Sequence, residues 1–405
     1  MRIRITPSVD GVPEDGGAPQ IPTSKSHAQR ALCLAAFLPV ETSIDDLPAA
    51  RDVRVLSTAL QDVSAGVLQL LDNGTAMRIL SVLLPLLGEE CAIDGGPRLK
   101  QRPLIASVEF LTRYGGTSTE DWPRRFSGRG VDWPEHLEVD ASLTTQPASG
   151  VLLGAALRLA RHGARHCVHI RKPSAHEYLL VTIEVLEWFG FSVDSWWEGE
   201  DLVVDFTRWT RPAPGHRVRI PIDASSFTFY AGLMAAHGRA IQPPTDPGPH
   251  PDWLFSDDLD RLLHAKPGEI LKFEELHLRP DTFPCLAALA ALRHGRTEFS
   301  GVPALRLKES DRIRAMSVAL TSLGAACREL PDGLVVEGPL PAHDAAVDVP
   351  TPDDHRIVMA VALLGTRIPG GVVLDNPRAV EKSWPDYFDW LGRVAEVSPV
   401  SSPPV

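Results

Sequence analysis

The stretch IPTSKSHAQRALCLAAFL, from Ile21 to Leu38, passes from a cluster of polar and basic residues directly into an apolar run. A serine or threonine before such a run is typical of a helix N-terminus, where its side chain caps unpaired backbone N–H groups. That end of a helix also carries the positive pole of the helix dipole, so it attracts phosphate and carboxylate groups. The stretch therefore predicts a helix whose first turns suit an anion.

Five further segments begin in the same way, with Ser, Thr, Asp or Asn before an apolar run. They are Leu71 to Gly88, Leu143 to Ala160, Ile222 to Gly238, Leu278 to Gly295 and Thr351 to Gly365. Most of these helices are followed by a strand-like stretch, such as HCVHIRK, and by a second helix, and DLVVDFTRW is a further stretch that alternates like a strand. The order predicts a unit of strand, helix, strand and helix that recurs about six times.

The length of 405 residues and the repeats favour two domains, because three units in each bury their helices better than six in a row. We assign residues 21–221 to one domain and residues 1–20 together with 222–405 to a second, discontinuous domain. The fold class is α/β (α+β). Within the second domain, PPTDPGPHPD, from Pro243 to Asp252, is expected to form a surface loop.

The composition argues against several classes of protein. A net charge of −12 is the wrong sign for a nonspecific nucleic-acid binder, and no uninterrupted apolar stretch reaches the ~18 residues of a membrane span. The five cysteines are scattered and never spaced CxxC, which is typical of reduced thiols and speaks against structural zinc. We expect a cytoplasmic protein that binds no nucleic acid, no membrane and no metal.

Basic residues nevertheless recur within the helix-start motifs, as a cleft that focuses small anions requires. SKSHAQR places Lys25, Ser26 and Arg30 on the first turns of the first helix. DNGTAMR provides Gly74, which allows a ligand to approach the backbone closely, and GGPRLKQRP puts Arg98 beside a glycine pair. Taken singly, each motif also fits an ordinary helix start or basic turn without a ligand.

The segment LRLKESDRIRAM, from Leu305 to Met316, combines both charge signs most densely. Lys308 and Arg312 are four residues apart and are expected to share a helix face, with Glu309 beside them. A carboxylate held among cations serves as an acid or base when its surroundings tune its pKa, whereas the alternative is a set of surface ion pairs. Charged residues of three other motifs complete the set: Asp281, His355, Arg356 and Lys382.

SKS, NGTAMR, GGPRLKQRP, RLKESDRIRAM, DDHR and KSWPDYF follow one another between Ile21 and Phe388. In this order they resemble the 5-enolpyruvylshikimate-3-phosphate synthases of the enolpyruvyl transferase family. That family has two domains of three βαβαββ units each, in a pseudo-threefold arrangement, with ligands in the interdomain cleft. The resemblance implies transfer of the carboxyvinyl group of phosphoenolpyruvate to the 5-hydroxyl of shikimate 3-phosphate with release of phosphate. It implies a monomer without a metal or organic cofactor.

The resemblance also assigns residues to the two substrates. For phosphoenolpyruvate it implies these: Lys25, Gly74, Arg98, Gln146, Arg312, Arg356 and Lys382. For shikimate 3-phosphate it implies these: Ser26, Arg30, Thr144, Thr145, Gln146, Ser174, Asp281 and Lys308. In the family the glycine at position 74 leaves room for glyphosate, so we expect a glyphosate-sensitive enzyme.

The catalytic roles implied by the resemblance fall on five residues. Asp281 would contact the attacking 5-hydroxyl and act as its base, helped by Lys308. Glu309 would protonate the methylene carbon of phosphoenolpyruvate, with His355 close by, and Lys25 belongs to the same set. Two carboxylates on either side of a developing cation, with anionic groups clamped by lysine and arginine, suit this chemistry.

The chain departs from the family pattern at three places. Thr144 and Thr145 stand where a Ser-Ser pair is usual, and they keep the hydroxyls. Ala304 stands where asparagine is often found, which puts one sugar contact in question. Around IRKPSAHEYLL, either Ser174 or Arg171 takes the role of a family serine.

Two other functions are weighed against this one. The related UDP-N-acetylglucosamine enolpyruvyl transferases open with a Lys-Asn pair and carry a reactive loop cysteine. This chain has Lys25-Ser26 and no cysteine between Cys91 and Cys167. A non-catalytic shikimate-phosphate binder is the alternative of a different class, and the intact charged motifs argue against it.

Overall fold

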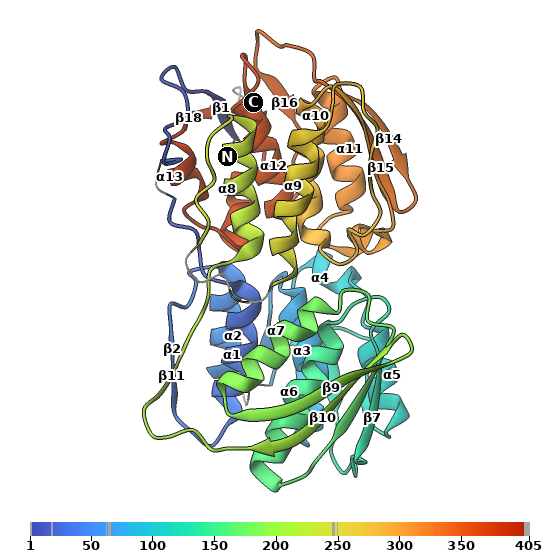
Figure 1. Ribbon diagram of the computed structural model, residues 1–405. Coiled ribbons are helices and arrows are strands. Elements are labelled where there is room, and N and C mark those ends of the chain that lie inside the picture. The colour runs from blue at the N-terminus through green and yellow to red at the C-terminus, as the bar shows by residue number, and fades with distance from the viewer. Residues whose placement is uncertain are drawn as a thin grey trace. The chain divides into compact units, whose positions relative to one another are not determined.

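The computed structural model describes residues 2–17, 19–61, 63, 66–244, 248 and 250–400 (Figure 1). The chain divides into two compact units. Unit 1 comprises Met1–Pro22, Ala49–Arg51 and Ile222–Val405, and unit 2 comprises Thr23–Pro48 and Asp52–Pro221. Each unit has its own set of helices and sheets.

All six predicted helix starts are confirmed. Unit 2 contains α1 (Lys25–Phe37), α3 (Gly74–Leu86) and α6 (Gln146–His162), and unit 1 contains α8 (Ala224–Ala236), α10 (Phe283–Leu292) and α12 (His355–Gly365). Four of them have side-chain caps of the expected kind, because a side-chain oxygen accepts a backbone N–H of the first turn. These caps are Ser24, Asn73, Asp223 and Asp354.

These helices, three in each unit, form the centres of the two units. All 11 residues of α12 are buried, as are 12 of the 13 residues of α3. A helix that is apolar on all sides is stable only inside a core, which explains their long apolar runs. The remaining helices bury one face or are short: α2 (Arg51–Gln61), α4 (Pro97–Gln101), α5 (Ile105–Arg113), α7 (Glu177–Trp188), α9 (Phe255–His264), α11 (Arg312–Ser322) and α13 (Tyr387–Leu391).

The strands repeat one pattern four times. In each four-stranded sheet the first pair is parallel and the other two pairs are antiparallel. Unit 2 has two such sheets. The first has the order β3 (Leu68–Gln69), β4 (Glu90–Asp94), β6 (Arg124–Ser127), β5 (Thr117–Ser118). The second has the order β7 (His136–Asp140), β8 (Cys167–Arg171), β10 (Asp201–Trp209), β9 (Phe191–Glu198). Unit 1 also has two. One has the order β12 (Leu271–Phe273), β13 (Gly295–Phe299), β15 (Gly333–Gly338), β14 (Ala326–Leu330). The other has the order β16 (Val347–Val349), β17 (Val372–Leu374), β1 (Arg2–Pro7), β18 (Ala395–Val400).

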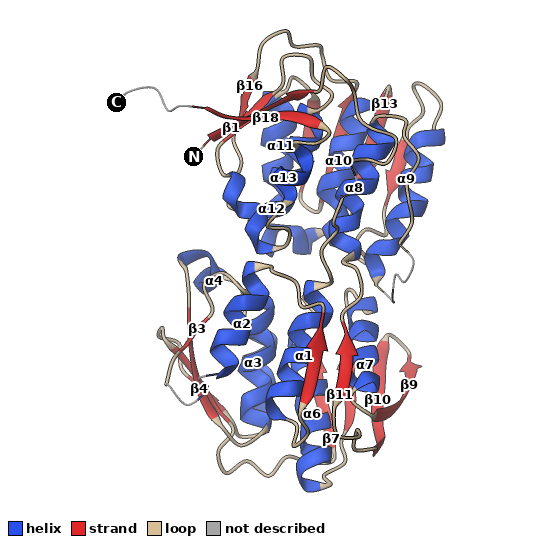
Figure 2. Ribbon diagram, turned by 90° about the vertical axis from the view of Figure 1, so that its left-hand side faces the viewer, coloured by secondary structure: helices blue, strands red, loops and turns tan. Residues whose placement is uncertain are grey.

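Each of these sheets takes its strands from a βαβαββ segment, except that β1 from the N-terminal end completes the last one. A fifth, two-stranded ladder joins β2 (Thr42–Asp45) and β11 (His216–Arg219) in parallel. Figure 2 shows the strands on the outside of each unit, with the buried helices between them. The sheets thus cover the helix cores, whose N-terminal caps hold the charged motifs in place.

The prediction of a surface loop from Pro243 to Asp252 was wrong at the end of the segment. The segment ends in a short 3-10 helix, η2 (Pro251–Leu254), and the side chain of Asp252 is buried rather than on the surface. The hydroxyl of Ser225 donates a hydrogen bond to the Asp252 carboxyl, which partly replaces the water that the carboxyl loses. Residues 245–247 and 249 of this segment lie outside the described part of the chain.

None of the helices in the described part of the chain combines the length and the apolar character that crossing a membrane requires. All five cysteines lie in that part and are free thiols. Burial raises the pKa of both Cys33 and Cys91 to about 12, so these thiols stay protonated and weakly nucleophilic at neutral pH.

Gly150 sets the close approach of α3 and α6, and its replacement tests this contact. A Cβ at position 150 would lie 2.5 Å from the carbonyl oxygen of Ile79 and 2.5 Å from a methyl carbon of Val82. We expect Gly150→Ala to lower the free energy of unfolding by about 1–3 kcal/mol, measured by urea denaturation, because one helix must shift. Gly392→Ala is the control, since its Cβ meets its nearest neighbour at 3.4 Å. Equal stability of the two variants would contradict the prediction.

Candidate active site

A buried arginine organises the charged residues of unit 1. Arg312, the first residue of α11, is 1% exposed and donates to three carboxylates. Its Nη1 lies 2.6 Å from Asp281 Oδ1, and its Nη2 lies 2.7 Å from Glu309 Oε2. Its Nε lies 2.8 Å from Asp354 Oδ2. We call these four residues, with Lys308 and Arg356, the Arg312 network. Because Arg312 is buried and shared, the network is not the set of surface ion pairs considered as the alternative.

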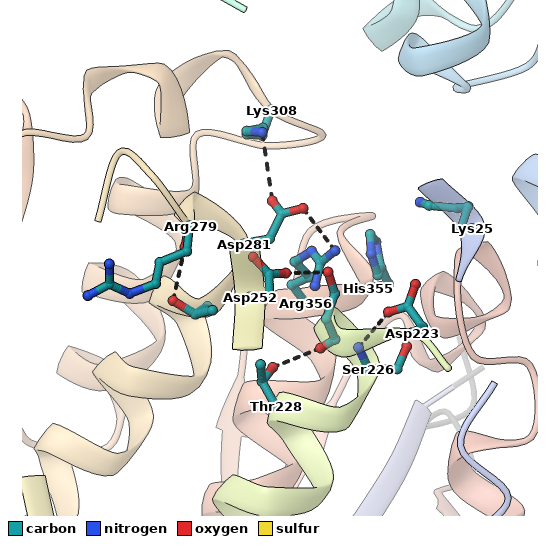
Figure 3. A network of polar contacts seen from close by, with 12 residues as sticks. Lys25, Asp223, Ser226, Thr228, Asp252, Arg279, Asp281, Lys308, His355 and Arg356 are labelled. Atoms are coloured by element: carbon teal, nitrogen blue, oxygen red, sulfur yellow. Dashed lines mark hydrogen bonds and ion pairs between the residues drawn. The ribbon is translucent and has the colours of Figure 1, made fainter. Parts of the chain in front are cut away.

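Among the carboxylates of the Arg312 network, Asp281 has the largest number of cationic partners in the described residues. It lies in the 3-10 helix η3 (Pro280–Thr282), directly before α10. Arg356 Nη2 donates to its Oδ2 at 2.9 Å, and Lys308 Nζ lies 3.7 Å from its Oδ1 (Figure 3). Burial alone would raise the pKa of Asp281, but Arg356, Lys308 and Arg312 together lower it well below its ordinary value. Asp281 is therefore ionised at neutral pH.

Asp354 joins the network to the N-terminus of α12. One of its oxygens accepts the backbone N–H of Arg356 at 3.1 Å, and the other accepts the hydroxyl of Ser310 at 3.0 Å. His355 begins α12 and is buried, and Lys382 ends the 3-10 helix η5 (Pro377–Lys382) and is also buried. The helix cap thus fixes the backbone that carries His355 and Arg356.

Lys308 and Arg312 do not share a helix face, so this prediction was wrong. The 3-10 helix η4 (Pro303–Leu307) ends just before Lys308, and α11 begins only at Arg312 because Asp311 caps it. Lys308 and Glu309 lie in the bend between these helices. The bend still brings Lys308 to Asp281 and Glu309 to Arg312. Asp311 caps α11, so this helix begins after Lys308. Lys308 and Arg312 therefore meet at Asp281 and not on one helix face.

Unit 2 holds the other predicted site residues: Lys25, Ser26, Arg30, Gly74, Arg98, Thr144, Thr145, Gln146 and Ser174. Lys25 begins α1, and its Nζ lies 3.0 Å from Oδ2 of the buried Asp52. Arg30, one turn later, is 2% exposed, and its Nε donates to Thr182 at 2.7 Å. Lys25 and Ser26 are only partly buried, so the first turn of α1 presents them to solvent more than Arg30.

Arg102, which follows α4 directly and packs against the start of α3, is a residue that the sequence analysis missed. A Cβ at Gly74 would collide with the guanidinium of Arg102, so this guanidinium lies flat against the first turn of α3. Arg102 is 7% exposed, and within the described residues its buried Nε has no hydrogen-bond partner. Arg98, which the sequence analysis chose from the same motif, lies 3.5 Å from Gln101 Oε1. An arginine left without an acceptor at a helix N-terminus is suited to an anion, and the motif GGPRLKQRP already contained it.

Gln146 begins α6 and is fixed from two sides. Arg78 Nη1 donates to its Oε1 at 2.7 Å, and its Nε2 donates to Thr75 Oγ1 at 2.9 Å. Thr144 Oγ1 accepts the backbone N–H of Gln146 at 3.4 Å, and Thr145 is buried at the cap position. The amide orientation of Gln146 is therefore set by its neighbours on α3.

Of the two residues considered for the family serine, Arg171 is engaged elsewhere. Its Nε lies 3.1 Å from Glu138 and its Nη2 lies 3.2 Å from Asp140. Ser174 lies in the loop after β8 and donates its backbone N–H to Ala141 at 3.1 Å. This geometry favours Ser174 for the role.

The fold matches solved enolpyruvyl transferases. The EPSP synthase from Acinetobacter baumannii superposes with a TM-score of 0.72 at 21% identity, covering 98% of this chain and 100% of that one. The enolpyruvyl transferase NikO from Streptomyces tendae superposes with a TM-score of 0.72 at 15% identity, covering 99% of both chains. The chain thus has the two-domain enolpyruvyl transferase fold.

Sequence comparison defines the branch of this class. The family model of EPSP synthase (3-phosphoshikimate 1-carboxyvinyltransferase) matches residues 62–242 and 257–391. The 3-phosphoshikimate 1-carboxyvinyltransferase of Thermococcus kodakarensis is 30% identical, over 95% of this chain and 99% of its own length. That of Syntrophobacter fumaroxidans is 31% identical, over 91% and 95%. This chain belongs to the EPSP synthase family.

The Arg312 network makes a stability prediction. Arg312→Met would leave Asp281, Glu309 and the fully buried Asp354 without their shared cation. We expect the variant to lose roughly 3–5 kcal/mol of unfolding free energy in urea denaturation, as when one partner of a buried ion pair is removed.

The matched control is Arg217→Met, because Arg217 makes two hydrogen bonds with Asp45 but is exposed. Its loss of unfolding free energy should be much smaller, because water screens an exposed ion pair. Similar losses in both variants would show that the burial of Arg312 does not matter.

Proposed function

We propose that this chain transfers the carboxyvinyl group of phosphoenolpyruvate to the 5-hydroxyl of shikimate 3-phosphate and releases phosphate. The reaction belongs to the shikimate pathway, which leads to aromatic amino acids. The observation that carries the proposal is that Asp281 and Glu309 share the buried Arg312, with Lys308 and Arg356 beside them. Such an arrangement provides two carboxylates for proton transfer and cations for an anionic substrate.

In this proposal Arg312 and Arg356 bind the carboxylate of phosphoenolpyruvate. Both guanidinium groups are buried and both already bind carboxylate, since each donates to Asp281. A substrate carboxylate would take over part of this role, which needs no new desolvation of either arginine. It would also reduce the positive charge available to Asp281, so the pKa of Asp281 rises when the substrate binds.

The proton transfers follow from the positions of Asp281 and Glu309. Asp281 accepts the proton of the 5-hydroxyl as its oxygen attacks C2 of phosphoenolpyruvate, and Lys308 assists. Glu309 gives a proton to the methylene carbon, which becomes a methyl group in the tetrahedral intermediate, with His355 close by. Glu309, ionised after the first step, then takes back one methyl proton as the C2–O bond to phosphate breaks, which gives the enol ether, and the proton held by Asp281 leaves with the phosphate. The two proton transfers of the first step thus each have a group in the network: Asp281 accepts one proton and Glu309 donates the other.

The anionic phosphates are assigned to the basic residues and helix N-termini of the sequence motifs. Lys25, Gly74, Gln146 and Lys382 take the phosphate of phosphoenolpyruvate, and Arg102 joins them because its buried Nε lacks a protein acceptor in the described residues. Arg98 stays a prediction from the sequence. Shikimate 3-phosphate is assigned to these residues: Ser26, Arg30, Thr144, Thr145, Gln146, Ser174, Asp281 and Lys308. Helix N-termini and arginine forks favour such groups.

We also propose that the protein is a monomer in the cytoplasm. The five free thiols support the cytoplasm, because they fit a reducing compartment. The monomer rests on the family resemblance. Glyphosate sensitivity, expected from Gly74, also stays a prediction.

The first test is phosphate release from phosphoenolpyruvate by the purified protein, with and without shikimate 3-phosphate. We expect release only with shikimate 3-phosphate, together with an enolpyruvyl product seen by mass spectrometry. Release that requires a UDP-sugar instead would place the chain with the UDP-N-acetylglucosamine enolpyruvyl transferases.

Glu309→Gln separates catalysis from binding. The amide keeps the size of the side chain and still accepts from Arg312, but it has no proton to give at neutral pH. We expect turnover to fall by roughly 10²–10⁴-fold while the affinity for shikimate 3-phosphate, measured by calorimetry, stays unchanged. If the native protein binds shikimate 3-phosphate without turnover, the chain is a non-catalytic binder.

Arg102 and Arg98 are distinguished by matched substitutions in one motif. We expect Arg102→Gln to raise the KM for phosphoenolpyruvate by roughly 10- to 100-fold, since a charge-assisted contact is lost, and Arg98→Gln to change it less. Gly74→Ala should also raise this KM, because its Cβ displaces the Arg102 guanidinium. A larger effect at Arg98 would reverse the assignment.

A further inference from the structure

Unit 1 contains a buried carboxyl beside the Arg312 network that none of the assigned roles uses. Asp252 lies in η2 and is 1% exposed. Figure 3 shows its carboxyl group below that of Asp281 and next to Arg356. A buried carboxyl at the edge of a charged site affects every anion that binds there.

The contacts of Asp252 keep it in this position. The hydroxyl of Ser225, from the first turn of α8, donates to its Oδ2. Its backbone N–H donates to Nδ1 of His250 at 3.2 Å, and that same nitrogen lies 4.0 Å from Oδ2. Because Nδ1 accepts this hydrogen bond, His250 holds the backbone of Asp252 in place.

The charged groups around Asp252 come from four elements. His250 precedes η2, Asp223 caps α8, Arg279 and Asp281 lie at η3, and Arg356 lies on α12. Arg279 is itself occupied by the buried Asp258, at 2.5 Å and 2.7 Å. Two carboxylates therefore face Asp252, and the cation that acts on it most is Arg356.

We propose that Asp252 is a positioning residue for the substrate carboxylate, acting through Arg356, and that it must be uncharged for phosphoenolpyruvate to bind tightly. The inference rests on the proposed function of the Arg312 network. A second negative charge beside Arg356 would compete with the substrate for the same guanidinium. A neutral carboxyl leaves Arg356 to Asp281 and the substrate.

The protonation of Asp252 agrees with this geometry. Burial and the neighbouring Asp281 raise the pKa of Asp252 to about 7, against the opposing effects of Arg356 and the Ser225 hydrogen bond. The group is thus neutral below this pH and ionises above it. Since the ionised form disfavours the substrate, binding of phosphoenolpyruvate above pH 7 takes up a proton, by reciprocity of the two equilibria.

The pH dependence of the KM for phosphoenolpyruvate tests the inference, with shikimate 3-phosphate saturating. In the native protein we expect this KM to rise roughly tenfold from about pH 6 to pH 9, the size of a typical coupling between two sites. Asp252→Asn stays neutral at every pH and should remove most of the rise, whereas Asp260→Asn, an exposed change on α9, should leave it. Superimposable profiles of the native protein and Asp252→Asn would overturn the inference while the proposed function stands.

Ser225→Ala gives a second, directional test. The hydrogen bond from Ser225 lowers the pKa of Asp252, so its loss should move the rise in KM to higher pH. A shift to lower pH, or none, would contradict the inference. Asp252→Asn should also resist urea better than the native protein at pH 8. At this pH the unfolded native chain has an ionised Asp252. Folding must therefore either return a proton to the Asp252 carboxyl or bury its negative charge, and both cost free energy that Asp252→Asn avoids.

Calorimetry separates this inference from the proposed function. In the Glu309→Gln protein with shikimate 3-phosphate bound, phosphoenolpyruvate is titrated at pH 8 in two buffers of different ionisation enthalpy. We expect proton uptake that disappears when Asp252→Asn is added. Binding without proton uptake would overturn the role of Asp252 alone. No binding of phosphoenolpyruvate would overturn the proposed function, and this inference with it.

Discussion

The charged half of unit 1 depends on one buried guanidinium. Arg312 is 1% exposed, and it meets Asp281, Glu309 and Asp354 at 2.6 to 2.8 Å. These carboxylates come from η3, from the bend before α11 and from the cap of α12, so one cation joins three elements. Removing it would leave carboxylates buried without a partner, which costs far more than losing an exposed pair. The network therefore sets the positions of the proposed acid, base and carboxylate binders at once.

Much of the fold could be predicted because its inner helices carry strong local signals. Ser24, Asn73, Asp223 and Asp354 each cap a helix that is followed by an apolar run, and each predicted helix forms. Capping and burial agree at these positions, so local propensity and tertiary structure give the same answer. The charged motifs of the sequence also contain the residues that the structure joins in the Arg312 network.

The positions that could not be predicted are those where a distant partner decides. Proline and glycine around Asp252 are typical of an exposed loop, and nothing nearby in the sequence indicates that Ser225 would bury its carboxyl. Lys308 was expected on a helix, but Asp311 caps α11, which begins only at Arg312, four residues after Lys308. Arg102 and Arg98 are arginines of the same motif, and they are separated only in the structure, where Arg102 is buried against Gly74. Each of these outcomes depends on contacts between segments far apart in the chain or on one competing cap.

The Arg312 network also explains how the proposed anion site keeps its buried cations paired before a ligand binds. Arg312 and Arg356 are buried, and an unpaired buried cation would be strongly unfavourable. Asp281 accepts hydrogen bonds from both of them, at 2.6 Å and 2.9 Å, so each guanidinium has a carboxylate partner within unit 1. The same contacts hold the pKa of Asp281 well below its ordinary value, which makes it a weak base. A substrate carboxylate that shares the arginines would relieve this effect, so the base gains strength only when the substrate is in place. Stability without ligand and reactivity with ligand thus follow from the same ion pairs.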